Sequence, residues 1–443
     1  MIDLRVVVEK LESRGVSEAE VVMWKNRRIR VSYTEQPNEL LDLDTISLGI
    51  RIIINKRIGV LGIEDVSLDR IDEYIDQAIS ITKTSPEDPN WRHLNRSYGK
   101  TDIPGVYSKE LEEVSYDKIS SLIREIIQSI KKEDPDAKVS RGSLSINNVE
   151  LSYTNSYMSD VVTRKENSFS IYTLVRIDTS EGTGSFSDFV IGRSLNKELD
   201  VYEFSRNITH KAREFVKAEK TETGKYTVVF ENIVNAAILS AVFSPAISSE
   251  NIYRGRSPLV NKVGDQVLNE KIEIVDDGTV GEYIGSREFD DEGHPTQRTV
   301  IVERGVLRNY LYDSYYANLM NTRSTGNAWR SISSSPRPSH NVLVMKSGSE
   351  SLDDLIKDIG RGVYVVRVIG EWLSNPVSGY TQATITHAYE IKNGEICKAL
   401  KGGTLTMNLY EGYGKNLVDI AKETRKVPRV VAPHIIISDV SIS

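Results

Sequence analysis

Cysteine is almost absent from this chain, whose 443 residues include only Cys397. A single cysteine excludes an internal disulfide framework, fits a reducing compartment, and is expected as a small apolar filler of a strand. No apolar run approaches the ~20 residues that a membrane-spanning helix needs. The N-terminus carries charges throughout and lacks the apolar core of a signal peptide. We therefore expect a cytoplasmic protein that does not contact a membrane.

Several chemical signatures are also missing. The chain has six histidines, and no two of them have zinc-motif spacing. There is no phosphate-binding P-loop, no dinucleotide-binding G-x-G-x-x-G after a strand, and no G-x-S-x-G nucleophile elbow. The net charge is −7 and the pI is near 5.6, so no basic surface for nucleic acid is expected.

The first half of the chain consists of two similar blocks. In the first, a helix at 3–14 precedes strands at 20–34 and 43–54 and a helix near 71–79. A proline-containing linker at 85–105 follows. The second block has a helix at 119–130, strands at 139–154 and 160–177, and a helix near 198–218. This shared order, with Ser-Tyr-Thr at 32–34 and again at 152–154, suggests a structural duplication. We expect an α/β domain at 1–95 and a second, related α/β domain at 106–220.

The second half, residues 221–443, has short β-rich runs separated by turns. Asn393-Gly394 predicts a two-residue hairpin, because both residue types tolerate positive φ. We expect only three helices here, near 231–243, 313–320 and 409–423. The first is aliphatic and should be buried, with Asn232 as N-cap and Pro245 as its end. This pattern predicts a mostly antiparallel β domain with a few packed helices, so the whole chain is α+β.

The sharpest polar cluster is Asp290-Asp291-Glu292-Gly293-His294. Its acids and histidine could ligate a cation or pair a base with a carboxylate. The alternative is a solvated turn, with Asx-turns and a positive φ at Gly293. We favour the turn, because neighbours in a tight turn rarely converge on one ion.

Two further polar loops follow. The first loop, at 325–327, could clamp a carboxylate or an extended peptide with its main-chain N–H groups. Alternatively, it is a polar loop in which Gly326 ends the preceding helix. Both alternatives stay open. In the second, paired glycines permit close backbone approach, and Asn408 is more readily explained as a helix cap. The residues are Thr325, Gly326 and Asn327 in the first loop, and Gly402, Gly403, Thr404 and Asn408 in the second.

Segments spread over most of the chain, the last five of them in one register, resemble the TldD/PmbA family, bacterial and archaeal proteins once labelled modulators of DNA gyrase. The segments are GIRIIINKRIGVLG, YRGRSPLVNKVGDQV, VDDGTVG, FDDEGHPTQRTVIVERGVLRNYLYD, RSTGNAWR and KGGTLTMN. The resemblance implies a zinc peptidase system. TldD-type members carry H-E-x-x-x-H on a helix and a cysteine as third ligand, and the PmbA/TldE-type subunit pairs with them. Such assemblies act on peptides and unfolded segments.

This chain departs from the family's metal motif. Counting back without gaps from Arg256-Ser257 places the motif on residues 240–245, which include Ser240, Ala241 and Pro245. None of these side chains can bind zinc as histidine does, and none can act as the general base. The segment RKVPRVVAPHII, where the family cysteine is expected, contains none. The resemblance therefore implies no catalytic residue and no metal ligand in this chain, with zinc in a TldD-like partner.

Three functional hypotheses follow from the sequence. The leading one is a non-catalytic PmbA/TldE-like subunit of a heterodimeric zinc peptidase that acts on peptides or unfolded segments. The second is a peptide-binding adaptor that acts as a homodimer. The third is a solo peptidase with a relocated metal site on Asp290, Asp291, Glu292 and His294.

Overall fold

The N-terminal half forms one long six-stranded sheet with the order β3-β2-β1-β4-β5-β6. The structure is a computed structural model that describes residues 3–443, apart from the Leu68 side chain; residues 1–2 of the expected N-terminal domain lie outside the described residues. The first block contains α1 (Leu4–Ser13), β1 (Glu18–Tyr33), β2 (Pro37–Ile54), β3 (Arg57–Ile63), a 3₁₀ turn (Leu68–Arg70) and α2 (Ile71–Thr84). The second contains α3 (Lys109–Glu112), α4 (Tyr116–Glu133), β4 (Ala137–Asn155), β5 (Val162–Thr179), β6 (Gly182–Gly192), α5 (Leu195–Glu198), α6 (Val201–Glu214), a 3₁₀ turn (Phe215–Lys217) and β7 (Glu219–Lys220).

The two blocks meet at the centre of this sheet, where β1 pairs with β4. Each block contributes three strands, and the strand order of one mirrors that of the other. Tyr33 lies opposite Gly142, and Val22 lies opposite Tyr153. The two Ser-Tyr-Thr segments therefore occupy equivalent positions in the mirrored sheet, which supports the duplication. The third strands, β3 and β6, were not predicted, and the domain boundaries stay predictions.

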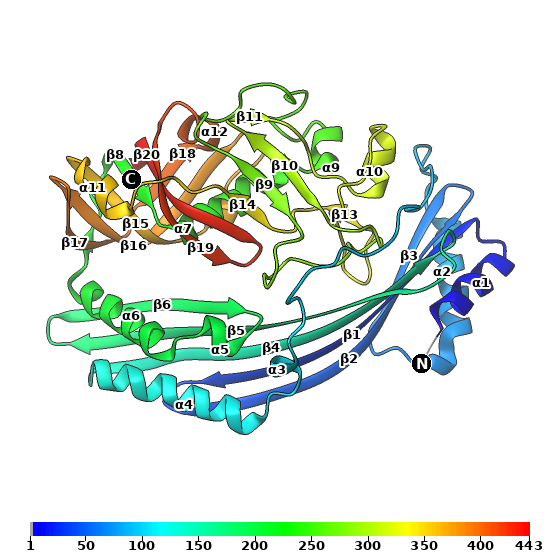
Figure 1. The fold of residues 1–443 in the computed structure, drawn as a ribbon, viewed down its shortest axis with the longest axis horizontal. Coiled ribbons are helices and arrows are strands. Elements are labelled where there is room, and N and C mark those ends of the chain that lie inside the picture. Colours follow the sequence, from blue (N-terminus) through cyan, green and yellow to red (C-terminus); the bar gives the residue numbers. More distant parts are fainter. Residues whose placement is uncertain (1–2) are drawn as a thin grey trace.

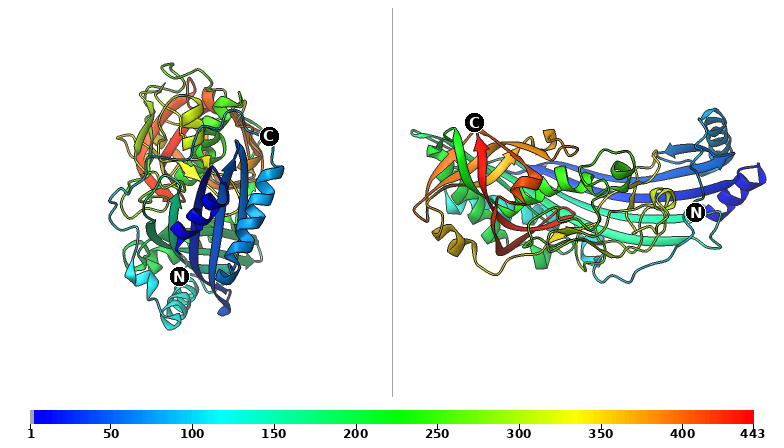
Figure 2. Two further views of the ribbon diagram at one scale, coloured as in Figure 1. Left: turned by 90° about the vertical axis from the view of Figure 1, so that its right-hand side faces the viewer. Right: turned by 90° about the horizontal axis from the view of Figure 1, so that it is seen from above.

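All four long helices of this half pack on one face of the sheet. Alternate residues of β1 point to the same side, and these residues contact helices at both ends of the strand. Val21 and Met23 share a core with α1 and α2 at one end, and Ile29 and Val31 share a core with α4 and α6 at the other. The C-terminal domain covers the opposite face, where Val22 packs in a cluster with Phe289 and Ile332. Figure 1 shows the two helix pairs at opposite ends of the curved sheet, and Figure 2 shows the C-terminal domain stacked over it.

The C-terminal half is a twelve-stranded, mostly antiparallel sheet with short helices, which confirms the expected α+β class. Its strands are β8 (Gly224–Phe230), β9 (Ile274–Asp277), β10 (Arg298–Glu303), β11 (Val306–Leu307), β14 (Leu343–Met345), β15 (Arg361–Ile369), β16 (Tyr380–Lys392), β17 (Glu395–Lys401), β18 (Thr404–Asn408), β19 (Leu417–Val427) and β20 (Val430–Ile442), joined by β7. A separate pair is formed by β12 (Ala328–Trp329) and β13 (Arg337–Pro338). The helices are α7 (Asn232–Ile238), α8 (Ser244–Ala246), α9 (Ser249–Tyr253), α10 (Ser314–Leu319), α11 (Leu352–Lys357) and α12 (Leu409–Gly412), with a 3₁₀ turn at Glu371–Leu373.

In this half, the sequence predicted the position of the hairpin turn correctly but not the length of the last helix. The hairpin between β16 and β17 turns at Asn393 and Gly394, with φ of 51° and 79°. The expected helix at 409–423 is wrong: it ends at Gly412, and residues 417–427 instead form β19, which pairs with β20. Pairing with the distant strand β20 therefore outweighs the local helix preference of residues 417–423. Cys397 is exposed on β17, so the expectation of an apolar filler is also wrong.

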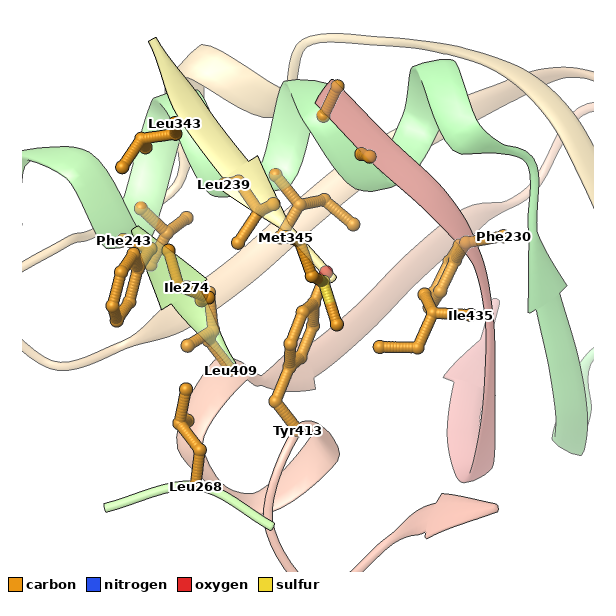
Figure 3. Packing of buried hydrophobic residues seen from close by; sticks show 14 of the residues in the cluster. Phe230, Leu239, Phe243, Leu268, Ile274, Leu343, Met345, Leu409, Tyr413 and Ile435 are labelled. Carbon is orange, nitrogen blue, oxygen red and sulfur yellow. The ribbon is translucent and has the colours of Figure 1, made fainter. Parts of the chain in front are cut away.

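The aliphatic helix continues past the point where Pro245 was expected to end it. A π-helical segment, Leu239–Phe243, follows α7, and Pro245 lies inside α8. Proline lacks the N–H that an α-helix needs, and the wider π turn accommodates this lost hydrogen bond. Glu231, rather than Asn232, precedes the first helical residue. Figure 3 shows Leu239 and Phe243 in the domain core with Met345 and Tyr413.

No helix within residues 3–443 is both long enough and apolar enough to cross a membrane.

Candidate functional site

The helix that the resemblance aligns with the family's metal motif, residues 232–246, carries no histidine, cysteine or carboxylate. Ser240, Ala241 and Pro245 lie on a partly buried stripe of an otherwise buried helix. The imidazole of His340 lies beside this helix and is engaged, because its Nδ1 lies 2.6 Å from Ser244 Oγ in a hydrogen bond. Across residues 3–443, no group of three or more His, Cys, Asp or Glu is arranged to hold a metal ion. The donor set therefore does not fit the zinc that the resemblance implies for TldD-type members.

The acidic turn at 290–292 is buried rather than solvated, so the favoured expectation of a solvated turn is wrong. Asp290, Asp291 and Glu292 are 0%, 3% and 1% exposed. The local geometry of the expectation does hold. Asp290 Oδ1 accepts hydrogen bonds from the N–H groups of Glu292 and His294 at 2.9 and 3.0 Å, and Gly293 has a φ of 74°. Arginines from distant segments offset the free-energy cost of burying these carboxyl groups. The sequence of the turn alone does not reveal these partners.

Asp291 lies between two buried arginines. Its Oδ1 accepts hydrogen bonds from Arg164 of β5 and from Arg287, both at 2.9 Å. Its Oδ2 accepts the N–H of Arg330 at 3.0 Å. Burial opposes ionisation, but the two guanidinium groups outweigh it and hold the pKa of Asp291 below its usual value. The Asp291 carboxylate therefore connects the N-terminal sheet to the C-terminal domain through its hydrogen bond with Arg164.

Glu292 completes a second buried ion network. Glu20 of β1 and Arg51 of β2 lie opposite each other in the sheet, and Arg51 donates a hydrogen bond to Glu20 Oε2 at 2.9 Å. Arg51 also donates to Glu292 Oε1 at 3.2 Å. Tyr153 donates to Glu20 Oε2 at 2.9 Å, and Arg330 donates to Glu20 Oε1. Two acids thus share Arg51, and the whole network is closed to solvent.

Three carboxyl groups in this region have a pKa above the usual value. Burial raises the pKa of Asp290, and burial also raises that of Glu292. The pKa of Asp313, the N-cap of α10, lies well above its usual value because of burial and the nearby Glu292. Asp313 Oδ1 accepts the N–H of Tyr316 at 2.8 Å, whereas its Oδ2 is buried and has no hydrogen-bond partner among residues 3–443.

A cleft of about 570 Å³ lies beside this network, between the 85–105 linker and the C-terminal domain. It brings together His294 of the first cluster and Thr325 of the second. Within the described part of the chain, its lining carries two arginines and two histidines and no carboxylate; the basic residues are His93, Arg96, His294 and Arg323. This cleft is the candidate binding site of the chain.

The loop that contains Thr325 is a structural support for the cleft. Thr325 Oγ1 accepts the N–H of Tyr312 at 2.8 Å. Gly326 has a φ of 69° and packs so closely on Pro295 that a side chain would meet its carbonyl oxygen at 2.5 Å. Gly326 does not end the preceding helix: α10 ends at Leu319, and Asn321 takes the left-handed conformation there, with a φ of 53°.

The third cluster lies elsewhere and does not line the cleft. Gly402 and Gly403 have φ of 79° and 87° and turn the chain between β17 and β18. Thr404 begins β18, which pairs with β16 and β20. The expected cap is confirmed, because Asn408 Oδ1 accepts the N–H of Tyr410 at 3.0 Å and that of Glu411 at 3.3 Å.

Asn327 donates a hydrogen bond to the buried carboxyl group of Asp276, whose titration should make the stability of the protein depend on pH. Its amide donates to Asp276 Oδ2 at 2.6 Å, and the main chain of Asn341 donates to Asp276 Oδ1 at 2.7 Å. Asp276 is fully buried, and burial raises its pKa to about 7.

We expect the Asp276→Asn variant to gain stability relative to the parent as pH rises from about 4 to about 7, by at most about 1.4 kcal/mol per pH unit. In this window the folded parent holds a proton that the unfolded chain has released, so its stability falls with rising pH, whereas asparagine does not titrate. Urea unfolding of both proteins across this range measures the difference. A difference that stays constant with pH would contradict the assignment.

Sequence reasoning missed several residues that build this region: Glu20, Arg51, Asp276, Asp313 and Ser314. One signal was available. Arg51 interrupts the apolar run Gly49–Ile54, and a lone charge within a buried-looking strand indicates a buried ion pair. Its partner Glu292 could not be identified, because the two residues lie 241 positions apart.

Comparison with known proteins agrees with this architecture. Residues 223–443 match the PmbA/TldA metallopeptidase C-terminal domain. MJ0231 of Methanocaldococcus jannaschii is 38% identical over 226 residues, which cover 50% of this chain and only 52% of that protein. A metalloprotease PmbA homologue of Haemophilus influenzae is 24% identical over 98% of this chain and 94% of that one. The crystal structure of TldE from Thermococcus kodakarensis superposes with a TM-score of 0.90 at 25% identity, covering 99% of each chain. The chain therefore belongs to the PmbA/TldD family.

Proposed function

We propose that this chain is a non-catalytic, TldE-type subunit of a zinc metallopeptidase that acts on peptides or unfolded segments. The observation that carries the proposal is that the helix at 232–246 contains no zinc ligand and no general base. The resemblance aligns this helix with the metal-binding helix of TldD-type members. Likeness to TldE over the full chain supports the same role. In this proposal zinc and the H-E-x-x-x-H motif belong to a TldD-like partner, and the complex is a cytoplasmic heterodimer.

A solo peptidase with a relocated metal site on Asp290, Asp291, Glu292 and His294 has weaker support. Asp291 is bonded to two arginines, and Glu292 to Arg51 and a main-chain N–H. Metal binding would have to displace these buried partners. The hypothesis of a homodimeric peptide-binding adaptor predicts the same fold as the proposed subunit. The affinity-capture experiment below distinguishes the two hypotheses.

The purified chain should contain no stoichiometric zinc and should cleave no unfolded substrate. Metal analysis and a casein-type cleavage assay, with and without a chelator, measure this. Affinity capture from an extract of the source organism should recover a chain with H-E-x-x-x-H. Stoichiometric zinc together with chelator-sensitive cleavage by the chain alone would contradict the proposal, and recovery of this chain alone would favour the homodimeric adaptor.

A further inference from the structure

We propose that the cleft beside the buried ion network binds a carboxylate of a peptide, so that this subunit selects acidic segments or chain ends. The inference rests on the proposed role in peptide handling and adds the chemical class of ligand. Both carboxylate sources, an acidic side chain and a free C-terminus, present the same group to the cleft.

The charge of the cleft is the first support. The chain has a net charge of −7, yet the residues that the structure describes around this cavity include two arginines, two histidines and no carboxylate. Arg323 is exposed and has no ion pair or hydrogen bond with any of residues 3–443. Arg96 is held in place, because its guanidinium lies 4.4 Å from the Tyr157 ring centre and donates to the Tyr157 hydroxyl at 3.0 Å. Arginine is the side chain best suited to a carboxylate, since its donors form a planar fork.

The two histidines make the same contact, because Nδ1 of each ring faces the carbonyl oxygen of the next residue. His294 Nδ1 lies 2.9 Å from the carbonyl oxygen of Pro295, and His93 Nδ1 lies 2.7 Å from that of Leu94. A carbonyl oxygen only accepts, so Nδ1 carries the hydrogen in both rings. Each Nε2 has no hydrogen-bond partner among residues 3–443, and it donates to a carboxylate oxygen only when the ring is protonated.

An unpartnered buried hydroxyl points to a ligand. Ser314 lines the cleft and is 6% exposed, and its Oγ has no hydrogen-bond partner within the described chain. Buried hydroxyls are normally satisfied, so this group is a donor available to an oxygen in the cleft. The Ser314 N–H is already used by Glu292 Oε2 at 2.8 Å.

The acids behind the cleft do not cancel its attraction for an anion. Glu292 shares Arg51 with Glu20, and burial raises the pKa of Asp313 well above its usual value. The cleft volume of about 570 Å³ lies within the range of known ligand sites and accommodates a segment of a few residues.

Binding of fluorescent peptides to the purified full chain, followed by anisotropy, tests the proposal. One peptide contains glutamates and a free C-terminus; matched peptides carry Glu→Gln changes, an amidated C-terminus, or both. The acidic peptide should bind at least about 10-fold more tightly than the doubly neutral one. Loss on Glu→Gln assigns the side chains as the source, and loss on amidation assigns the chain end.

Two variants connect the binding to the cleft. Arg323→Gln should weaken acidic-peptide binding about 10-fold, and Ser314→Ala a few-fold. Arg124→Gln is the control, because Arg124 is an exposed residue of α4, far from the cleft. Equal binding of acidic and neutral peptides, or equal effects of Arg323→Gln and Arg124→Gln, would overturn the proposal. Because no cleavage is measured, this failure is distinct from a failure of the subunit role.

Discussion

Replacing Arg51 with methionine should lower the free energy of unfolding by about 3–5 kcal/mol. Arg51 is 3% exposed and pairs with Glu20 and Glu292, which are themselves buried. Its removal leaves two carboxylates without their main counter-charge in a site closed to water, and the cost of such an uncompensated charge exceeds the value of an exposed ion pair.

Urea unfolding followed by tryptophan fluorescence measures this loss. The guanidinium of Arg51 lies 5.7 Å from the Trp91 ring centre, so Trp91 reports locally on the contact between sheet and C-terminal domain. Arg57→Met is the matched control on the neighbouring strand, because Arg57 pairs with the exposed Glu87 and should contribute at most about 1 kcal/mol. Equal effects of the two substitutions would show that the buried network does not stabilise the fold.

Replacing Phe243 with alanine should also be strongly destabilising, by about 3–5 kcal/mol. Phe243 ends the π segment and is fully buried in the core that Figure 3 shows. Loss of its ring would leave a cavity among Leu239, Leu343 and their neighbours, which cannot close without moving strands of the large sheet.

Thermal unfolding of Phe243→Ala measures this effect. Val263→Ala is the control, because Val263 is 52% exposed and its truncation should change stability by no more than about 0.5 kcal/mol. A Phe243→Ala protein as stable as the control would contradict the view of this helix as core scaffold.

The features that the sequence predicted well are those that local chemistry decides. The helix at 119–130 was identified from its apolar face, and Ile119, Ile123 and Ile126 are indeed buried in α4. The Asn393-Gly394 hairpin and the Asn408 cap depend on neighbouring residues alone. Such features need no knowledge of the rest of the fold.

The features that were missed depend on distant partners. Residues 417–427 form a strand because β20 lies beside them. The acidic turn at 290–292 is buried because Arg51 and Arg164 reach it from the N-terminal sheet. The cleft combines linker residues near 93–97 with residues near 294 and 309–325. No local pattern brings these segments together, so the candidate site was predicted only in fragments.

The most direct test of the subunit role is a cleavage assay of an unfolded substrate with this chain, its H-E-x-x-x-H partner, and the mixture. We predict no cleavage by this chain, and zinc-dependent cleavage by the mixture that exceeds that of the partner alone. Changing the motif glutamate of the partner to glutamine should abolish the activity of the mixture. Cleavage by this chain alone, or a mixture no more active than the partner, would contradict the account.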